Sequence, residues 1–111
     1  MSVSTHVLDT ALGRPATGIP VTLSHRGTDR RWSVVGRGVT DVEGRIRELS
    51  EGGLAAGVYR LDFDTAQYFE RQGTPAFYPE VSVVFTAPDY RTHIHVPLLL
   101  SPFGYATYKG T

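Results

Sequence analysis

The sequence predicts an all-β protein, an antiparallel β-sandwich that carries one short helix. Short segments in which apolar and polar residues alternate recur along the chain, and turns with glycine or proline separate them. Residues 58–63 (VYRLDF) alternate most cleanly and predict a strand. Roughly seven or eight short strands with a single helix are typical of a β-sandwich. We expect the 111 residues to form one domain, 1–111.

The expected strands follow one another at short intervals. They are predicted at 3–8, 19–24, 32–39, 45–49, 58–63, 80–86, 91–100 and 103–108. Gly36 and Gly38 interrupt the third strand, which indicates a bulge or the close approach of another backbone. Pro97 indicates an edge or a bend, because it cannot donate a ladder hydrogen bond. Residues 51–57 and 87–90 are expected to be connections.

The helix is expected to begin near Asp64 or Thr65 and to end at Gly73. Gln67 follows Asp64 by three positions, which is the spacing of a capping box. Phe69 and its apolar neighbours lie on one side of the helix, so we expect the helix to pack on a sheet rather than to be enclosed.

The composition excludes several classes of function. Eleven basic residues balance eleven acidic ones, so no net field attracts nucleic acid or an acidic membrane. The absence of cysteine excludes disulfides, thiol catalysis and cysteine-ligated metal centres. No apolar run approaches the ~20 residues that span a bilayer, and residues 1–10 lack the features of a secretory signal, so we expect a cytoplasmic protein. The cluster of Arg26, Arg30 and Arg31 is more typical of a solvated hairpin tip than of a phosphate site.

The histidine pair near the end of the chain is the first candidate for chemistry. His93 and His95 point to the same side of a strand because side chains alternate along it. The pair fits a metal half-site, a catalytic base or two surface residues, and a zinc site would need a third ligand such as His6. The chain has no GxSxG elbow and no glycine-rich phosphate loop. These residues alone predict a β-sandwich with a possible histidine site.

Three further candidates are less specific on their own. His6 interrupts the first strand, and a single histidine there is most often a half-buried or surface residue. Arg45 follows the turn at 41–44, where exposed arginines are common. The chain stops three residues after Tyr108, so we expect this tail to end against a strand and to share one site with the histidine pair.

The two ends of the chain give these candidates a common context. Residues 4–16 (STHVLDTALGRPA) and 93–111 (HIHVPLLLSPFGYATYKGT) resemble the signature ends of the 5-hydroxyisourate hydrolases, which belong to the transthyretin-like family of purine catabolism. Residues 40–45 (TDVEGR) and 77–81 (FYPEV) are also similar to segments of that family. The resemblance covers essentially the whole chain, and its two end motifs are highly specific.

The resemblance implies a transthyretin-like sandwich of two four-stranded sheets. It also implies a homotetramer, a dimer of dimers with a central channel, whose sites open where the dimers meet. Such an assembly fits the apolar segment 98–100 and the aromatic segment 103–108, which would otherwise leave apolar surface and a strand edge exposed. The implied partner is a small purine-derived substrate, and neither a metal nor an organic cofactor is expected.

The resemblance also assigns the site residues. It implies catalytic groups at His6, Arg45 and His95. Substrate-binding groups are implied at His6, Arg45, Tyr108, Lys109, Gly110 and Thr111. Two of these depart from the family pattern, because Lys109 stands where the family has arginine and Thr111 where it has serine. Lysine keeps the charge but loses the planar set of donors.

The implied reaction is the hydrolysis of 5-hydroxyisourate to 2-oxo-4-hydroxy-4-carboxy-5-ureidoimidazoline. We expect His6 and His95 to hold the water, with His95 as the general base. Arg45 would stabilise the developing oxyanion, and Tyr108 would hydrogen-bond the substrate and close the pocket. The alternative is a carrier that binds an aromatic ligand in the same channel without chemistry. A carrier has no need of histidines at both positions, so the sequence favours the enzyme.

Overall fold

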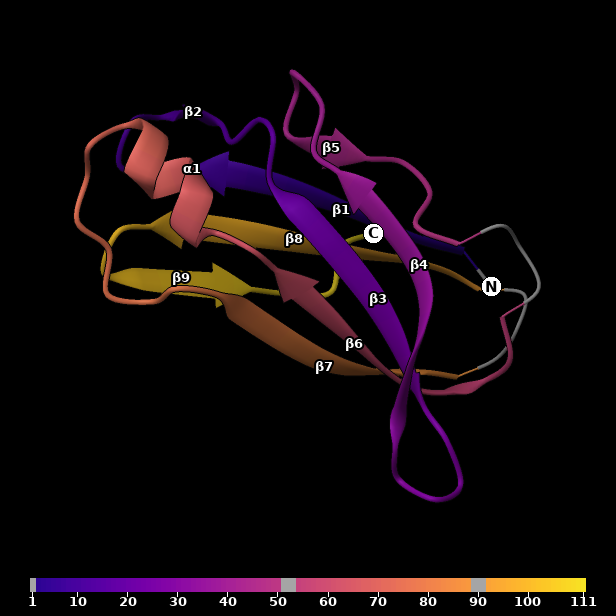
Figure 1. Cartoon of the computed structure of the whole chain (residues 1–111). Coiled ribbons are helices and arrows are strands. Elements are labelled where there is room, and N and C mark those ends of the chain that lie inside the picture. Colours follow the sequence, from indigo (N-terminus) through magenta and orange to yellow (C-terminus); the bar gives the residue numbers. More distant parts are fainter. Residues whose placement is uncertain (1, 51–53, 89–91) are drawn as a thin grey trace.

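The computed structural model describes residues 2–50, 54–88 and 92–111, which form a sandwich of two β-sheets (Figure 1). The sheet that we call the β1 sheet has the order β2 (Arg14–Pro15), β1 (Ser2–Asp9), β8 (His93–Ser101), β9 (Gly104–Thr107), with β5 (Arg45–Ile46) also paired to β1. The β3 sheet has the order β4 (Trp32–Val39), β3 (Pro20–Arg26), β6 (Gly57–Phe63), β7 (Val81–Ala87). The predicted all-β sandwich is confirmed.

The β1 sheet differs from the expectation in two details. It has five strands instead of four, because two-residue strands, β2 and β5, both pair with β1. The strand expected at 45–49 is therefore shorter than predicted. In addition, β1 runs parallel to β8 over its whole length, whereas the other strand pairs of the described residues are antiparallel. The alternation of side chains indicates which face a strand buries, but it does not indicate its partner.

The parallel register of β1 and β8 divides their side chains between the core and the outer face. In β1 the residues with odd numbers from Val3 to Asp9 are at most 1% exposed, and in β8 the residues with even numbers from Ile94 to Leu100 are at most 5% exposed. Ser4 and His95 pair directly, and both therefore lie on the outer face. The same register puts the histidine pair and the first-strand histidine on one surface.

Pro97 lies inside a continuous strand. The ladder with β1 continues through it, with His6 opposite Pro97, whereas the ladder with β9 begins only at the next residue, Leu98. The predicted bend is therefore wrong, but on the β9 side the segment 93–97 has an edge that β9 does not cover.

The predictions for Gly36 are confirmed. The register of β3 and β4 shifts beside it, and a Cβ at Gly36 would collide with the carbonyl oxygen of Leu49.

The single helix of the described residues, α1 (Ala66–Arg71), follows β6 and precedes β7 in the chain, and it lies at the end of the sandwich near β2 (Figure 1). Thr65 is its N-cap, but no side chain makes a cap hydrogen bond, so the predicted capping box is wrong. Gly73, at a φ of 65°, follows the helix as predicted. The buried Tyr68 fixes α1 to the β1 sheet, because its hydroxyl donates to Asp9 Oδ2 at 2.7 Å.

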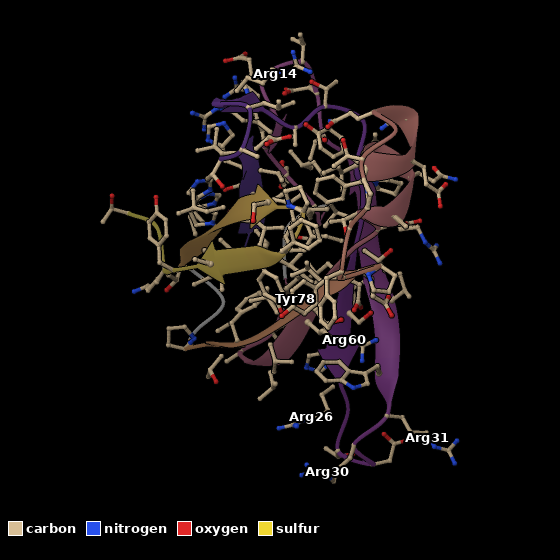
Figure 2. All side chains as sticks on the ribbon, turned by 90° about the vertical axis from the view of Figure 1, so that its left-hand side faces the viewer. Arg14, Arg26, Arg30, Arg31, Arg60 and Tyr78 are labelled. Atoms are coloured by element: carbon tan, nitrogen blue, oxygen red, sulfur yellow. The ribbon has the colours of Figure 1, made fainter. Side chains whose placement is uncertain are left out.

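The basic cluster lies where the sequence predicts. Figure 2 shows Arg26, Arg30 and Arg31 at the protruding end of the β3–β4 hairpin, and the last two are exposed. No helix of the described residues is long and apolar enough to cross a membrane. The connections expected at 51–57 and 87–90 lie partly outside the described residues.

The exposed apolar surface lies in only one of the two segments that the sequence indicates. Leu98 and Leu100 belong to the core, because they point inward from β8. The large exposed side chains near the C-terminus instead come from β9 and the residues beside it, and they are Phe103, Tyr105 and Tyr108. Near the C-terminus, exposed apolar surface therefore lies at β9 and beside it, as expected for the segment 103–108, rather than on the segment 98–100.

Candidate active site

A chain of hydrogen bonds connects the histidines of β8 to the serines of β1. The parallel register places Ser2 opposite His93 and Ser4 opposite His95. His93 Nδ1 lies 2.5 Å from Ser2 Oγ, and His93 Nε2 lies 2.9 Å from Ser4 Oγ. Ser4 Oγ also lies 2.7 Å from His95 Nδ1. His95 is thus held through Nδ1, which leaves Nε2 available for other contacts.

The first-strand histidine is oriented by the turn on its other side. His6 pairs with Arg45 in the antiparallel ladder of β1 and β5, so the two side chains share the outer face. His6 Nε2 lies 2.8 Å from the carbonyl oxygen of Glu43. A carbonyl can only accept, so Nε2 carries a hydrogen and Nδ1 is the nitrogen that can accept one when the ring is neutral.

The turn that precedes Arg45 fixes the position of its backbone. The Oδ1 atom of Asp41 accepts hydrogen bonds at 2.9 Å from the backbone N–H groups of Glu43 and Arg45. The hydrogen bond from Arg45, together with that from Glu43 and the charges of Arg47 and Arg45, holds the pKa of Asp41 below its usual value. Gly44 has a φ of 75°, and a Cβ there would collide with the carbonyl oxygen of Val7. This turn therefore requires glycine directly before Arg45.

The side chains of this region line a pocket of about 290 Å³, which we call the histidine pocket. Its lining residues come from β1, β5, β8 and the C-terminal residue, and they are Ser4, Thr5, Arg45, Ile46, Arg47, His93, His95 and Thr111. Burial lowers the pKa of His95, and the nearby Arg45, His6 and His93 lower it further. His95 is therefore neutral at neutral pH, as a proton acceptor must be.

The C-terminal residues divide between this pocket and another one. The backbone N–H of Gly110 donates to the carbonyl oxygen of His95 at 2.8 Å, and a Cβ at Gly110 would lie 2.5 Å from His95 Cδ2. Thr111 lines the histidine pocket. Figure 1 accordingly shows the C-terminus beside β1 and β8. Tyr108 and Lys109 instead line a separate pocket of about 270 Å³, the tail pocket.

The tail pocket lies between the edge strand β7 and the last residues of the chain. It is mainly apolar, and its lining residues are Val83, Val84, Phe85, Thr86, Ile94, Val96, Thr107, Tyr108 and Lys109. Within one chain, therefore, the structure brings His6, Arg45, His95, Gly110 and Thr111 together, whereas Tyr108 and Lys109 lie apart from them.

Sequence reasoning missed the residues that orient this group. It did not identify Ser2, Ser4 or Asp41, and it gave His93 no role apart from the pair. The signal in the sequence is the spacing of Ser2, Ser4 and His6, which places three polar side chains on one side of β1. The described residues include no group of three or more histidine, aspartate or glutamate side chains suited to a metal ion, so the zinc alternative gains no support.

Residues 3–110 match the sequence profile of the HIUase/Transthyretin family. The chain belongs to that family. The 5-hydroxyisourate hydrolase of Salmonella typhimurium is 44% identical over 110 residues, which are 98% of this chain and 80% of that protein. The structure of Klebsiella pneumoniae 5-hydroxyisourate hydrolase is 34% identical, covers 100% of both chains and has a TM-score of 0.88.

The same fold also occurs in a transthyretin that was solved in complex with thyroxine. The crystal structure of sea bream transthyretin in complex with thyroxine is 38% identical, covers 98% of this chain and 94% of its own, and has a TM-score of 0.91. The solved structures that are similar to this chain thus include both a hydrolase and a thyroxine complex. The fold alone does not decide between hydrolysis and ligand binding, so the residues of the site must decide.

Proposed function

We propose that this protein hydrolyses 5-hydroxyisourate to 2-oxo-4-hydroxy-4-carboxy-5-ureidoimidazoline. The names of its relatives in Salmonella and Klebsiella give 5-hydroxyisourate as the compound that those proteins hydrolyse. The observation that carries the proposal is a neutral His95 with Nε2 available, in a pocket that Arg45 also lines. Ring opening of a cyclic amide requires a base for the attacking water and a positive group for the oxyanion, and this pair supplies both.

The reaction begins with a water held between the two proposed acceptors. His95 Nε2 takes a proton from that water, and His6 Nδ1 helps to orient it. The water oxygen then attacks the ring carbonyl of the planar substrate. Arg45 donates to the oxygen on which negative charge develops, and its guanidinium remains charged throughout the reaction. The C–N bond breaks, and the ring nitrogen takes the proton from His95.

The competing function is that of a carrier. The likeness to the thyroxine complex of sea bream transthyretin suggests it. The contents of the histidine pocket argue against it, because two imidazoles, two guanidinium groups and a serine hydroxyl are polar groups that an aromatic ligand does not require. We therefore favour hydrolysis.

The proposal includes a homotetramer, a dimer of dimers. Val84 in β7, Tyr105 in β9 and Tyr108 are exposed apolar side chains along the edges of both sheets, and pairing these edges with a second copy would cover them. Tyr108 of one copy would then reach the substrate in the pocket of another. Sedimentation at micromolar concentration tests this assembly, and a stable monomer would contradict it.

A cytoplasmic location is also part of the proposal. A chain without cysteine forms no disulfide and suits a reducing compartment. Cell fractionation with an antibody to the native protein tests the location, and recovery outside the cytoplasm would contradict it.

The activity test follows the ultraviolet absorbance of freshly generated 5-hydroxyisourate with and without the protein. We expect the protein to accelerate its decay and to yield the ring-opened carboxylate. The control is the protein with His25→Gln, because this histidine packs against Tyr59 with tilted rings in the β3 sheet, away from the proposed site. Unchanged decay together with tight thyroxine binding would replace the enzyme with the carrier.

A further inference from the structure

Ser4 connects two imidazoles of different exposure. His95 is half-buried in the histidine pocket, whereas His93 is exposed, and Ser4 between them is 7% exposed. Both imidazoles line the histidine pocket, and the bonds from Ser2 to His93, from His93 to Ser4 and from Ser4 to His95 form an unbroken path of 2.5, 2.9 and 2.7 Å between the exposed His93 and the half-buried His95. The reaction described above uses only the last member of this path.

Counting the hydrogens of this path leaves two arrangements. A serine hydroxyl has one hydrogen, so Ser4 donates to one of its imidazoles and accepts from the other. When it accepts from Nδ1–H of His95, it donates to Nε2 of His93, whose own Nδ1–H donates to Ser2. His95 Nε2 then has a lone pair and no hydrogen, which is the state that a general base needs. The positive charge of Arg45 in the same pocket favours a lone pair there over an N–H group.

A positive charge on His95 during the reaction is unfavourable. Taking a proton from water makes His95 cationic, and burial together with Arg45, His6 and His93 opposes that charge. An exposed imidazole is a better position for the charge, because water solvates it. His93 is such an imidazole, and it is connected to His95 through a single hydroxyl group.

We propose that Ser4 and His93 are positioning residues that hold His95 with Nε2 free and move the positive charge of the intermediate from His95 to His93. This inference rests on the proposed hydrolase function. When Nε2 of His95 takes a proton from water, its Nδ1 proton passes to Ser4 Oγ, and the hydrogen of Ser4 passes to Nε2 of His93. When the C–N bond breaks, its electron pair goes to the ring nitrogen, which takes the Nε2 proton. The two transfers through Ser4 reverse in the same step, so that His95 regains its Nδ1 proton as it gives up the Nε2 proton, and the starting state is restored.

Three variants test this relay in the full-length protein. Ser4→Ala removes both bridging hydrogen bonds, whereas Ser4→Thr keeps the hydroxyl. His93→Gln keeps an amide that can bond to Ser4 but cannot carry the proton, so it separates the relay from simple positioning. We expect Ser4→Ala and His93→Gln to lower kcat by about one to two orders of magnitude, within the range of acid–base effects, with little change in KM. Ser4→Thr should retain most of the wild-type kcat.

Two further measurements respond to the relay but not to a merely structural role. In mixtures of H2O and D2O, kcat of the wild type should fall along a curve because several protons move together, and kcat of His93→Gln should fall along a straight line. Imidazole ¹⁵N chemical shifts without substrate should report hydrogen on Nδ1 of His95 in the wild type and on Nε2 in Ser4→Ala.

The possible failures can be told apart. A wild type that does not act on 5-hydroxyisourate would overturn the proposed function, and the ¹⁵N shifts would still test the tautomer of His95. If the wild type is active but His93→Gln retains its kcat and its curved solvent dependence, the relay is wrong. A hydrogen on Nε2 of His95 in the wild type would overturn it as well.

Discussion

The histidine pocket and the tail pocket differ in what a single chain contributes to them. The histidine pocket is lined by imidazole, guanidinium and hydroxyl groups that the strand register of one chain brings together. The tail pocket is mainly apolar and lies beside the edge strand β7. Tyr108, which lines it, is 58% exposed. The proposed catalytic groups thus lie in the histidine pocket, whereas exposed apolar surface lies at the tail pocket.

The difference indicates which pocket would need the proposed assembly to hold its side chains in place. Hydrogen bonds to Ser4 and Asp41 hold His95 and the backbone of Arg45 in the histidine pocket within one chain, and a bond to Glu43 holds the neighbouring His6. Nothing comparable fixes the Tyr108 side chain on the exposed edge in the described part of the chain. We therefore expect changes in the histidine pocket to act on the chemical step, and changes in the tail to act through its contact with His95 or with another copy.

The largest effect is expected when His95 is replaced. His95→Gln removes the proposed base, and the loss should be about 10²–10⁴-fold in kcat because general base catalysis contributes that much. His25→Gln is the matched control and should leave kcat within about twofold of the wild type, because it changes nothing in the pocket. Steady-state kinetics on 5-hydroxyisourate measure both. If His95→Gln keeps its activity, the histidine pocket is not the site.

A smaller effect is expected from the glycine that connects the tail to the histidine pocket. Gly110→Ala places a Cβ 2.5 Å from Cδ2 of His95, so either the tail or the imidazole must move. Because a misplacement of ~1 Å can cost about a hundredfold in rate, we expect a loss approaching that size.

Gly104→Ala is the control for this loss. Its Cβ would meet only Ser101 Oγ, at 3.8 Å, so activity should be preserved. Equal kinetics of the two variants would show that the contact between Gly110 and His95 has no influence on the reaction.

Local patterns in the sequence predicted the faces of the strands but not their partners. The alternation in 58–63 identified β6, because a strand that buries one face requires apolar residues at every second position. The Asp–Val–Glu–Gly turn at 41–44 was also predictable, since glycine is needed where φ is positive. In contrast, the bonds from Ser2 to His93 and from Ser4 to His95 each join residues 91 positions apart, and no local pattern specifies such a register.

The helix cap shows a second limit of local reasoning. Asp64 and Gln67 have the spacing of a capping box, yet the N-cap is Thr65 and its hydroxyl lies 3.4 Å from the carbonyl oxygen of Tyr78. The anchor of α1 is the buried bond between Tyr68 and Asp9, which are 59 positions apart. Tertiary contacts therefore decide the position of this short helix, as they do for most short helices.

A moderate effect on the rate is expected from pH, which acts through His95 in the histidine pocket. His95 must be neutral to accept a proton, and burial, Arg45, His6 and His93 lower its pKa from 6.5. Activity should therefore persist as the pH falls to 6.5, and below the lowered pKa kcat/KM should fall about tenfold per pH unit.

Arg45→Gln sharpens this test, because it removes a positive charge beside His95. The midpoint of the fall should move upward, although the overall rate is lower. Stopped-flow kinetics across about pH 5 to 8, where an ordinary histidine titrates, measure the profile. A flat profile would remove histidine from the role of base.

The smallest effect is expected from Lys109, the chain's single lysine, in the tail pocket. Lys109→Arg replaces a hydrated point charge with a planar set of donors, so kcat/KM should stay level or rise by about a few-fold. Acetylation with an amine-selective reagent sharpens the test, since its targets are Lys109 and the α-amino group. Treatment should lower the activity of the wild type and leave that of Lys109→Arg nearly unchanged. Equal losses in both proteins would assign the effect to the α-amino group and remove the charge of Lys109 from the proposed substrate contacts.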